Sequence, residues 1–167
     1  MGDIRSETIL QAMVKTVADV MSRDPIVVRS QTPIQEAIQT IAERRISGLP
    51  VVDDNGKLIG ILSETDLMWR ETGATPPAYI TILDSVIYLE NPKRYEKELH
   101  KVLGQTVGEV MTTEHIVTTT PDCSLHQAAQ LMHNKKVHRL PVLDEAGQVV
   151  GILTRGDVVR AIAEQER

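Results

Sequence analysis

The sequence predicts an α/β (α+β) fold made of two tandem repeats, each running strand, helix, strand, strand, helix. Two observations carry this prediction: one segment occurs twice along the chain, and its apolar residues switch between strand spacing and helix spacing. The length of 167 residues agrees with it, because that length suits one ordinary domain or two small units. A repeat of about fifty residues would be marginally stable alone, so we expect the two copies to pack together.

The repeat is defined by matching motifs at a nearly constant separation. Asp19-Val20-Met21 recurs 90 residues later as Glu109-Val110-Met111. Leu49-Pro50-Val51-Val52-Asp53 recurs 91 residues later as Leu140-Pro141-Val142-Leu143-Asp144. We attribute the change in separation to one residue inserted near Thr118 to Cys123.

This alignment sets His115 of the second copy opposite Pro25 of the first. The predicted organisation is a helical leader over residues 1–18, a first repeat over 19–70, a connector over 71–108 and a second repeat over 109–167.

Each repeat has a legible local structure, best seen in the first copy. Ile26-Val27-Val28 is a β-branched run typical of a short strand. Thr32 as N-cap, with Pro33 at the first helical position and Gln35 three residues on, predicts a capped helix. The remaining predicted elements are a hairpin of strands 49–52 and 58–62, a helix capped by Ser63, and in the second copy a helix from Ser124 and a strand over 148–153.

Composition excludes several classes of protein. Aromatic residues make up 2% of the chain and phenylalanine is absent, so the interior must be aliphatic. The net charge of -5 gives no overall basic face for nucleic acid, which leaves only the local Lys135 to Arg139 cluster as a remote alternative. The single Cys123 cannot form an internal disulfide, and no apolar run approaches the roughly 20 residues of a membrane helix. A cytoplasmic protein without membrane contact is expected.

The repeated motifs resemble a known family. "DVMSRDPIVV", "SGLPVVDDNGKLIGILSETDL", "EVMTTEHIVT" and "HRLPVLDEAGQVVGILTRGDV" are similar to the two halves of a cystathionine-β-synthase (CBS) domain pair, or Bateman module. The resemblance implies a pseudo-two-fold arrangement of the repeats with two clefts between them, where many members bind adenine nucleotides. It also implies a homodimer and a regulatory role without catalysis, whose downstream effector the sequence does not reveal.

An adenosine ligand needs acceptors for its ribose hydroxyls, and two pairs of residues fit. Ser63 with Asp66, and Thr154 with Asp157, each place a hydroxyl and a carboxylate at a helix start. Such pairs are also ordinary helix caps, so spacing alone favours a structural role. In the resembling family the residues at these positions contact ribose, which implies a shared role as cap and acceptor.

Phosphate donors differ between the two copies. His138 and Arg139 precede the second Leu-Pro-Val, whereas Ser47 and Gly48 precede the first, and Arg155 lies at the second helix start. The two clefts are therefore not expected to be equivalent, although a solvated helix end explains such cations equally well. The candidate adenine walls, each of which taken singly is more often plain core, are Ile26, Val27, Leu49, Pro50, Val51, Ile116, Val117, Leu140, Pro141 and Val142.

Other chemistry finds little support in the sequence. His100, His126 and His133 lack the companion ligands of a metal site and are expected on the surface. We find no pairing of nucleophile and base, so no catalytic residue, metal or cofactor is predicted beyond the regulatory nucleotide. The alternatives left open are a structural dimerisation module with vestigial clefts, or a sensor of S-adenosylmethionine or NAD. In the connector, Asn91-Pro92 leads into a predicted helix from Lys93 to Leu103. The connector could be a lid, a dimer contact or a filler layer.

Overall fold

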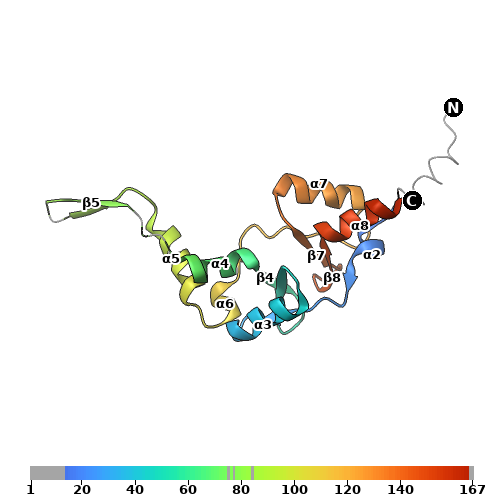
Figure 1. Cartoon of the computed structure of the whole chain (residues 1–167), viewed down its shortest axis with the longest axis horizontal. Coiled ribbons are helices and arrows are strands. Elements are labelled where there is room, and N and C mark those ends of the chain that lie inside the picture. The colour runs from blue at the N-terminus through green and yellow to red at the C-terminus, as the bar shows by residue number, and fades with distance from the viewer. Residues whose placement is uncertain (1–13, 75, 77, 84, 166–167) are drawn as a thin grey trace, which may run out of the picture. The chain divides into compact units, whose positions relative to one another are not determined.

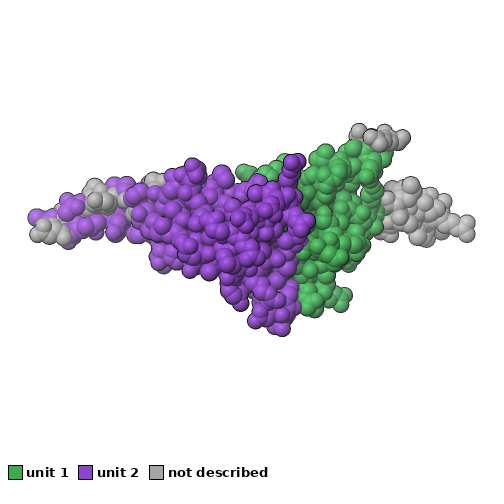
Figure 2. All heavy atoms as spheres, turned by 60° about the horizontal axis from the view of Figure 1, so that its bottom comes forward, with its two compact units in different colours: residues 1–25, 117–167 green, residues 26–116 purple. Residues whose placement is uncertain are grey.

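The computed structural model describes residues 14–74, 76, 78–83 and 85–165. These residues form two compact units: unit 1 contains the chain up to Pro25 and from Val117 onward, and unit 2 contains Ile26–Ile116 (Figure 2). The expected helical leader lies outside the described residues as far as residue 13, and the short helix α2 (Val17–Val20) follows it.

Unit 2 is a mixed sheet with helices packed on it (Figure 1). Strand β3 pairs in parallel with β2 and antiparallel with β4, with Leu49 opposite Leu62. Its elements are β2 (Val28–Arg29), α3 (Ile34–Arg44), β3 (Gly48–Val52), β4 (Leu58–Ser63), α4 (Glu64–Thr72), β5 (Tyr79–Ile82), β6 (Ser85–Tyr88), α5 (Pro92–Leu103) and α6 (Val107–Val110).

Unit 1 repeats this plan with its own sheet of order β1-β8-β7. Leu140 lies opposite Leu153 in the antiparallel β7–β8 pair, and an isolated parallel bridge from Thr119 to Val142 corresponds to the β2–β3 pair of unit 2. Besides α2, its elements are β1 (Ser22–Arg23), α7 (Leu125–Lys135), β7 (Arg139–Leu143), β8 (Val149–Thr154) and α8 (Arg155–Gln165). The predicted tandem α/β repeats are confirmed.

The boundaries of the two units differ from the boundaries of the two sequence repeats. Helix α2 and Met21 open the first repeat in sequence, yet they pack in the core of unit 1 with the second repeat. Helix α6 and Met111 open the second repeat and pack in unit 2. A motif search reveals similarity between segments, but burial of their apolar faces decides which sheet each segment covers.

The extra residue of the second repeat lies earlier than Thr118 to Cys123, so that placement is wrong. Met21 and Met111, 90 residues apart, approach equivalent strand glycines. Asp24 and His115, already 91 apart, share a left-handed backbone with φ of 50° and 56°. The insertion therefore lies between Met111 and His115, and His115 corresponds to Asp24 rather than to Pro25. Backbone conformation locates the insertion, whereas the similarity of residue types between the two copies led to the wrong position.

The predicted Thr32 capping box is also wrong. Helix α3 begins at Ile34 with Pro33 as N-cap and without a side-chain cap. The Thr32 hydroxyl instead accepts from the backbone N–H of Arg29 at 3.1 Å, and the Ile34 N–H donates to the carbonyl of Gln105 at 2.9 Å. A backbone partner distant in sequence satisfies the helix start in place of the local cap.

The connector forms the β5–β6 hairpin and helix α5, which confirms the predicted helix over 93–103. Helix α5 packs on α4 and α6 as a layer of unit 2. The hairpin reaches away from these helices (Figure 1), and Leu83 at its tip is 95% exposed. The connector is thus a filler layer in its helical half and an exposed arm in its β half.

Acid sensitivity is expected at the start of helix α2. The Asp19 carboxylate accepts from the backbone N–H of Thr16 at 2.9 Å and from its hydroxyl at 3.1 Å. These bonds, the backbone one first, hold the pKa of Asp19 below its ordinary value of 3.8. A lowered folded-state pKa adds stability that is present above about pH 4 and is lost as pH falls through the folded pKa.

We therefore expect the Tm of the parent protein to fall more steeply between about pH 5 and pH 3 than that of Asp19→Asn. Thermal unfolding followed by circular dichroism measures this slope. Thr16→Val, which removes one of the two donors, should give an intermediate slope, and equal slopes for all three proteins would contradict the assignment.

Candidate functional site

The hydroxyl and carboxylate pairs singled out in the sequence lie at equivalent strand-to-helix junctions. Ser63 ends β4 and caps α4, while Thr154 ends β8 immediately before α8. The side chains of Asp66 and Asp157 fold back to the preceding hydroxyl and backbone N–H, and both carboxylates are buried. Both pairs are helix caps, as the spacing predicts.

The second oxygen of Asp66 has partners within unit 2. Asp66 Oδ1 accepts from Lys101 Nζ at 2.6 Å and from the Thr112 hydroxyl at 2.8 Å. Lys101 comes from helix α5, and Thr112 follows α6 and exchanges two backbone bonds of 2.9 Å with Ile61 of β4. This carboxylate joins three segments of unit 2.

The second oxygen of Asp157 has a different partner. Its Oδ1 accepts from the Arg160 guanidinium, one turn further along α8. Ser22 is the counterpart of Thr112 by its pairing with Ile152 of β8, but among the described residues its hydroxyl makes no hydrogen bond to Asp157. The two carboxylates therefore share a cap but have unlike electrostatic surroundings.

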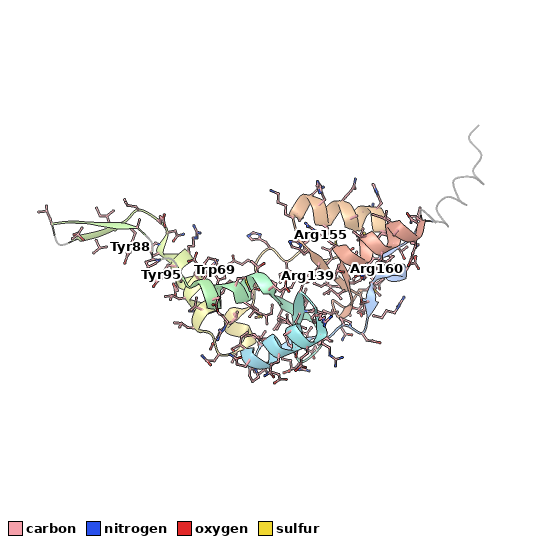
Figure 3. All side chains as sticks on the ribbon, viewed as in Figure 1. Trp69, Tyr88, Tyr95, Arg139, Arg155 and Arg160 are labelled. Atoms are coloured by element: carbon pink, nitrogen blue, oxygen red, sulfur yellow. The ribbon has the colours of Figure 1, made fainter. Side chains whose placement is uncertain are left out.

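Cations gather around the unit 1 junction. The backbone N–H of Arg155 donates to the carbonyl of His138 at 3.1 Å, and its Nε donates to the carbonyl of Val137 at 3.2 Å. Arg139, Arg155 and Arg160 all lie on unit 1 (Figure 3). This junction can therefore offer positive charge beside a carboxylate acceptor, a combination suited to ribose and phosphate together.

The corresponding junction of unit 2 lacks two of these arginines. The equivalent of the Arg155 bond runs from the Glu64 N–H to the Ser47 carbonyl at 3.1 Å, so glutamate stands where unit 1 has arginine. Trp69 occupies the position of Arg160. Both differences weaken the attraction of unit 2 for a phosphate.

The proposed wall residues fall into two groups. Six are buried in the cores of the two units: Leu49, Pro50, Val51, Leu140, Pro141 and Val142. Ile26 and Val27 are each 39% exposed, and Ile116 and Val117 are half-buried. The corrected alignment pairs Val117 with Ile26. The residues that precede β2 and Thr119 thus offer apolar surface, while the Leu-Pro-Val strands supply core packing.

Sequence reasoning missed Lys101, Thr112 and Arg160. Arg160 could have been found, because a basic residue three positions after an aspartate faces it on a helix. Lys101 and Thr112 carry no such local signal, since they reach Asp66 from 35 and 46 residues away.

His100, His126 and His133 are exposed, as expected. Across the described ranges, no three His, Cys, Asp or Glu side chains gather into a group that could hold a metal ion. Every helix in the same ranges is too short or too polar to cross a bilayer.

The family model of the CBS domain matches residues 17–71 and 107–164, which include both junctions. This chain belongs to the CBS-domain family. Among curated relatives of this CBS pair, the chloroplastic CBS domain-containing protein CBSX1 of Arabidopsis thaliana is 36% identical over 160 residues. That match covers 92% of this chain and 66% of the relative, so the CBS pair spans about two thirds of the relative's length.

The CBS pair is similar in structure to proteins that have been solved with bound ligands. CBSX2 in complex with AMP matches it with a TM-score of 0.76 and 32% identity, over 91% of this chain and 99% of that one. The CBS domain pair of protein MJ0100, in complex with 5′-methylthioadenosine and S-adenosyl-L-methionine, matches with a TM-score of 0.68 and 25% identity. The coverage is 91% of this chain and 98% of that one.

Proposed function

We propose that this CBS pair is a regulatory, non-catalytic module that binds an adenine nucleotide, with AMP, ADP or ATP as the ligand class. The observation that carries the proposal is the unit 1 junction, where the buried Asp157 carboxylate pairs with Arg160 on a helix that begins at the basic residue Arg155. A carboxylate is a good acceptor for a vicinal diol, and guanidinium groups suit phosphate oxygens.

Two similar proteins support an adenosine ligand. One is described in complex with AMP and the other with 5′-methylthioadenosine and S-adenosyl-L-methionine. These ligands share adenosine and differ beyond the ribose. The arginines of unit 1 favour the phosphorylated member for this chain, and S-adenosylmethionine and NAD are the alternatives to be tested beside it.

A second candidate function, structural dimerisation, rests on a groove of unit 2. Helices α3 and α4 border a groove of about 650 Å³ whose lining includes Ile38, Ile41, Leu67 and Met68. An apolar helix surface of this kind suits a second copy of the chain. We therefore propose a homodimer, whether or not its nucleotide sites are occupied. The cytoplasmic location stays a prediction.

Isothermal titration of the full chain tests the nucleotide proposal. We expect AMP to bind more tightly than adenosine, and Arg155→Ala to weaken AMP binding about tenfold while changing adenosine binding less than twofold. Arg44→Ala, which removes an exposed arginine of α3, is the matched control and should leave both affinities unchanged. Chromatography of AMP after incubation with the protein should recover the nucleotide unaltered, which tests the proposed absence of catalysis.

An absence of heat and of thermal shift with AMP, ADP, ATP, NAD and S-adenosylmethionine would refute the ligand proposal. If light scattering then showed a stable dimer, structural dimerisation would be the function favoured instead.

A further inference from the structure

We propose that Lys101 is an internal plug on the Asp66 carboxylate, so that each chain offers one ribose acceptor, at Asp157. This inference rests on the proposed nucleotide function and specifies how many acceptors that function uses. It also assigns a role to the connector, because Lys101 belongs to α5.

The Asp66 carboxylate has donors on all of its acceptor positions. Oδ2 accepts from the Ser63 N–H at 2.9 Å and from its hydroxyl at 3.2 Å. Oδ1 accepts from Lys101 at 2.6 Å and from Thr112 at 2.8 Å. Two carboxylate oxygens provide about four lone-pair sites, so a ribose diol could bind only by displacing one of these donors.

Lys101 is held firmly in this position. Its ammonium group also donates to the carbonyl of Val110 at 3.0 Å and lies 3.3 Å from the Thr112 hydroxyl. Its side chain is 20% exposed, against 6% for Asp66. Removing either charge would leave the other one desolvated without its counter-ion, which is costly, so a neutral diol is a poor competitor for this lysine.

Two further contacts fix helix α5 around the plug. Arg70 of α4 donates to the carbonyl of Gly104 at 2.8 Å, just past the end of α5. Lys97, one turn before Lys101, pairs with Glu114 at 3.0 Å. The lysine is therefore delivered by a helix that is anchored on both sides, not by a freely moving chain.

Asp157 lacks this closure. Its Oδ2 accepts from the Thr154 N–H at 2.8 Å and hydroxyl at 2.9 Å, which matches Asp66. Within the described residues, its Oδ1 receives one donor, the Arg160 guanidinium, whose side chain is 70% exposed. An exposed arginine can rotate back into water at little cost, which frees Oδ1 for a diol and the guanidinium for a phosphate.

Titrations with AMP and adenosine test the plug through binding stoichiometry. The parent chain should bind one AMP, Asp157→Asn should abolish that binding, and the matched Asp66→Asn should change the affinity less than threefold. Lys101→Met should add a second event seen with adenosine, which does not need the phosphate donors that unit 2 lacks.

Thermal unfolding without ligand tests the plug independently of any nucleotide. Both carboxylates cap a helix in the same way, so the cost of losing the cap cancels between the two asparagine variants. Because Asp66→Asn leaves the largely buried Lys101 unpaired, we expect it to lower the Tm by about 5 °C more than Asp157→Asn.

The possible results separate the two claims. Two AMP molecules on the parent chain, equal binding losses in the two asparagine variants, or a single adenosine site in Lys101→Met would each overturn the plug. Equal Tm losses would overturn it as well. The parent chain and all of its variants could fail to bind AMP and adenosine while Asp66→Asn still shows the larger Tm loss. In that case the proposed nucleotide function is wrong and the Lys101 plug on Asp66 stands.

Discussion

Replacing Leu140 with alanine is expected to lower the free energy of unfolding by about 3 kcal/mol. Leu140 lies on β7, is fully buried, and packs in the core cluster of unit 1 with Val17, Met132 and Leu153. The chain contains no phenylalanine, so no phenylalanine ring can move into the space that the leucine side chain leaves. The substitution therefore leaves a cavity in an aliphatic core.

Chemical denaturation followed by circular dichroism measures this loss. Leu49→Ala removes the equivalent side chain from β3 of unit 2 and should cost a similar amount. Leu103→Ala is the control, because that side chain is 65% exposed at the end of α5 and its loss should cost less than about 0.5 kcal/mol. A loss below 1 kcal/mol for both core variants would contradict the packing described above.

Gly151→Val is expected to destabilise unit 1 by about 2 to 3 kcal/mol, although valine is the better strand former. A Cβ on Gly151 would lie 3.0 Å from the carbonyl oxygen of Ser22 and closer still to Met21 Sδ. The glycine is required because the leading segment of the first repeat pairs antiparallel with β8 at this point, with Arg23 opposite Gly151.

A double-mutant cycle with Met21→Ala identifies the cause. Shortening Met21 should recover part of the loss caused by Gly151→Val, which would give a coupling of about 1 kcal/mol between the two sites. Additive effects would show that the leading segment does not press on Gly151. Gly60 and Met111 form the equivalent contact in unit 2, where a Cβ would lie 2.5 Å from the sulfur.

These close approaches matter for function because they fix the segment beside each junction. Thr112 directly follows Met111, and its hydroxyl is one of the four donors to Asp66. In unit 1, Ser22 directly follows Met21, but its hydroxyl is not among the donors to Asp157 in the described residues. The same close packing thus brings a hydroxyl donor to Asp66 and none to Asp157.

Much of the fold follows from local patterns that the sequence displays twice. The hairpins around Asp53 and Asp144, the cap at Ser63 and the helix start near Ser124 form as predicted, because turns and helix starts depend on residues a few positions apart. The insertion was misplaced for the opposite reason, since Ile116 and Val117 resemble Ile26 and Val27 in letters but not in backbone position.

The candidate site shows the same division. The sequence by itself determined the repeated architecture, the aliphatic interior and the unequal charge of the two junctions, because motif order, composition and the identities of Gly48 and Arg139 are local facts. Tertiary structure alone decided that Lys101 closes Asp66 and that Arg160 faces Asp157. A carboxylate's free acceptor sites depend on every donor that folding brings within about 3 Å, and such donors can come from anywhere in the chain.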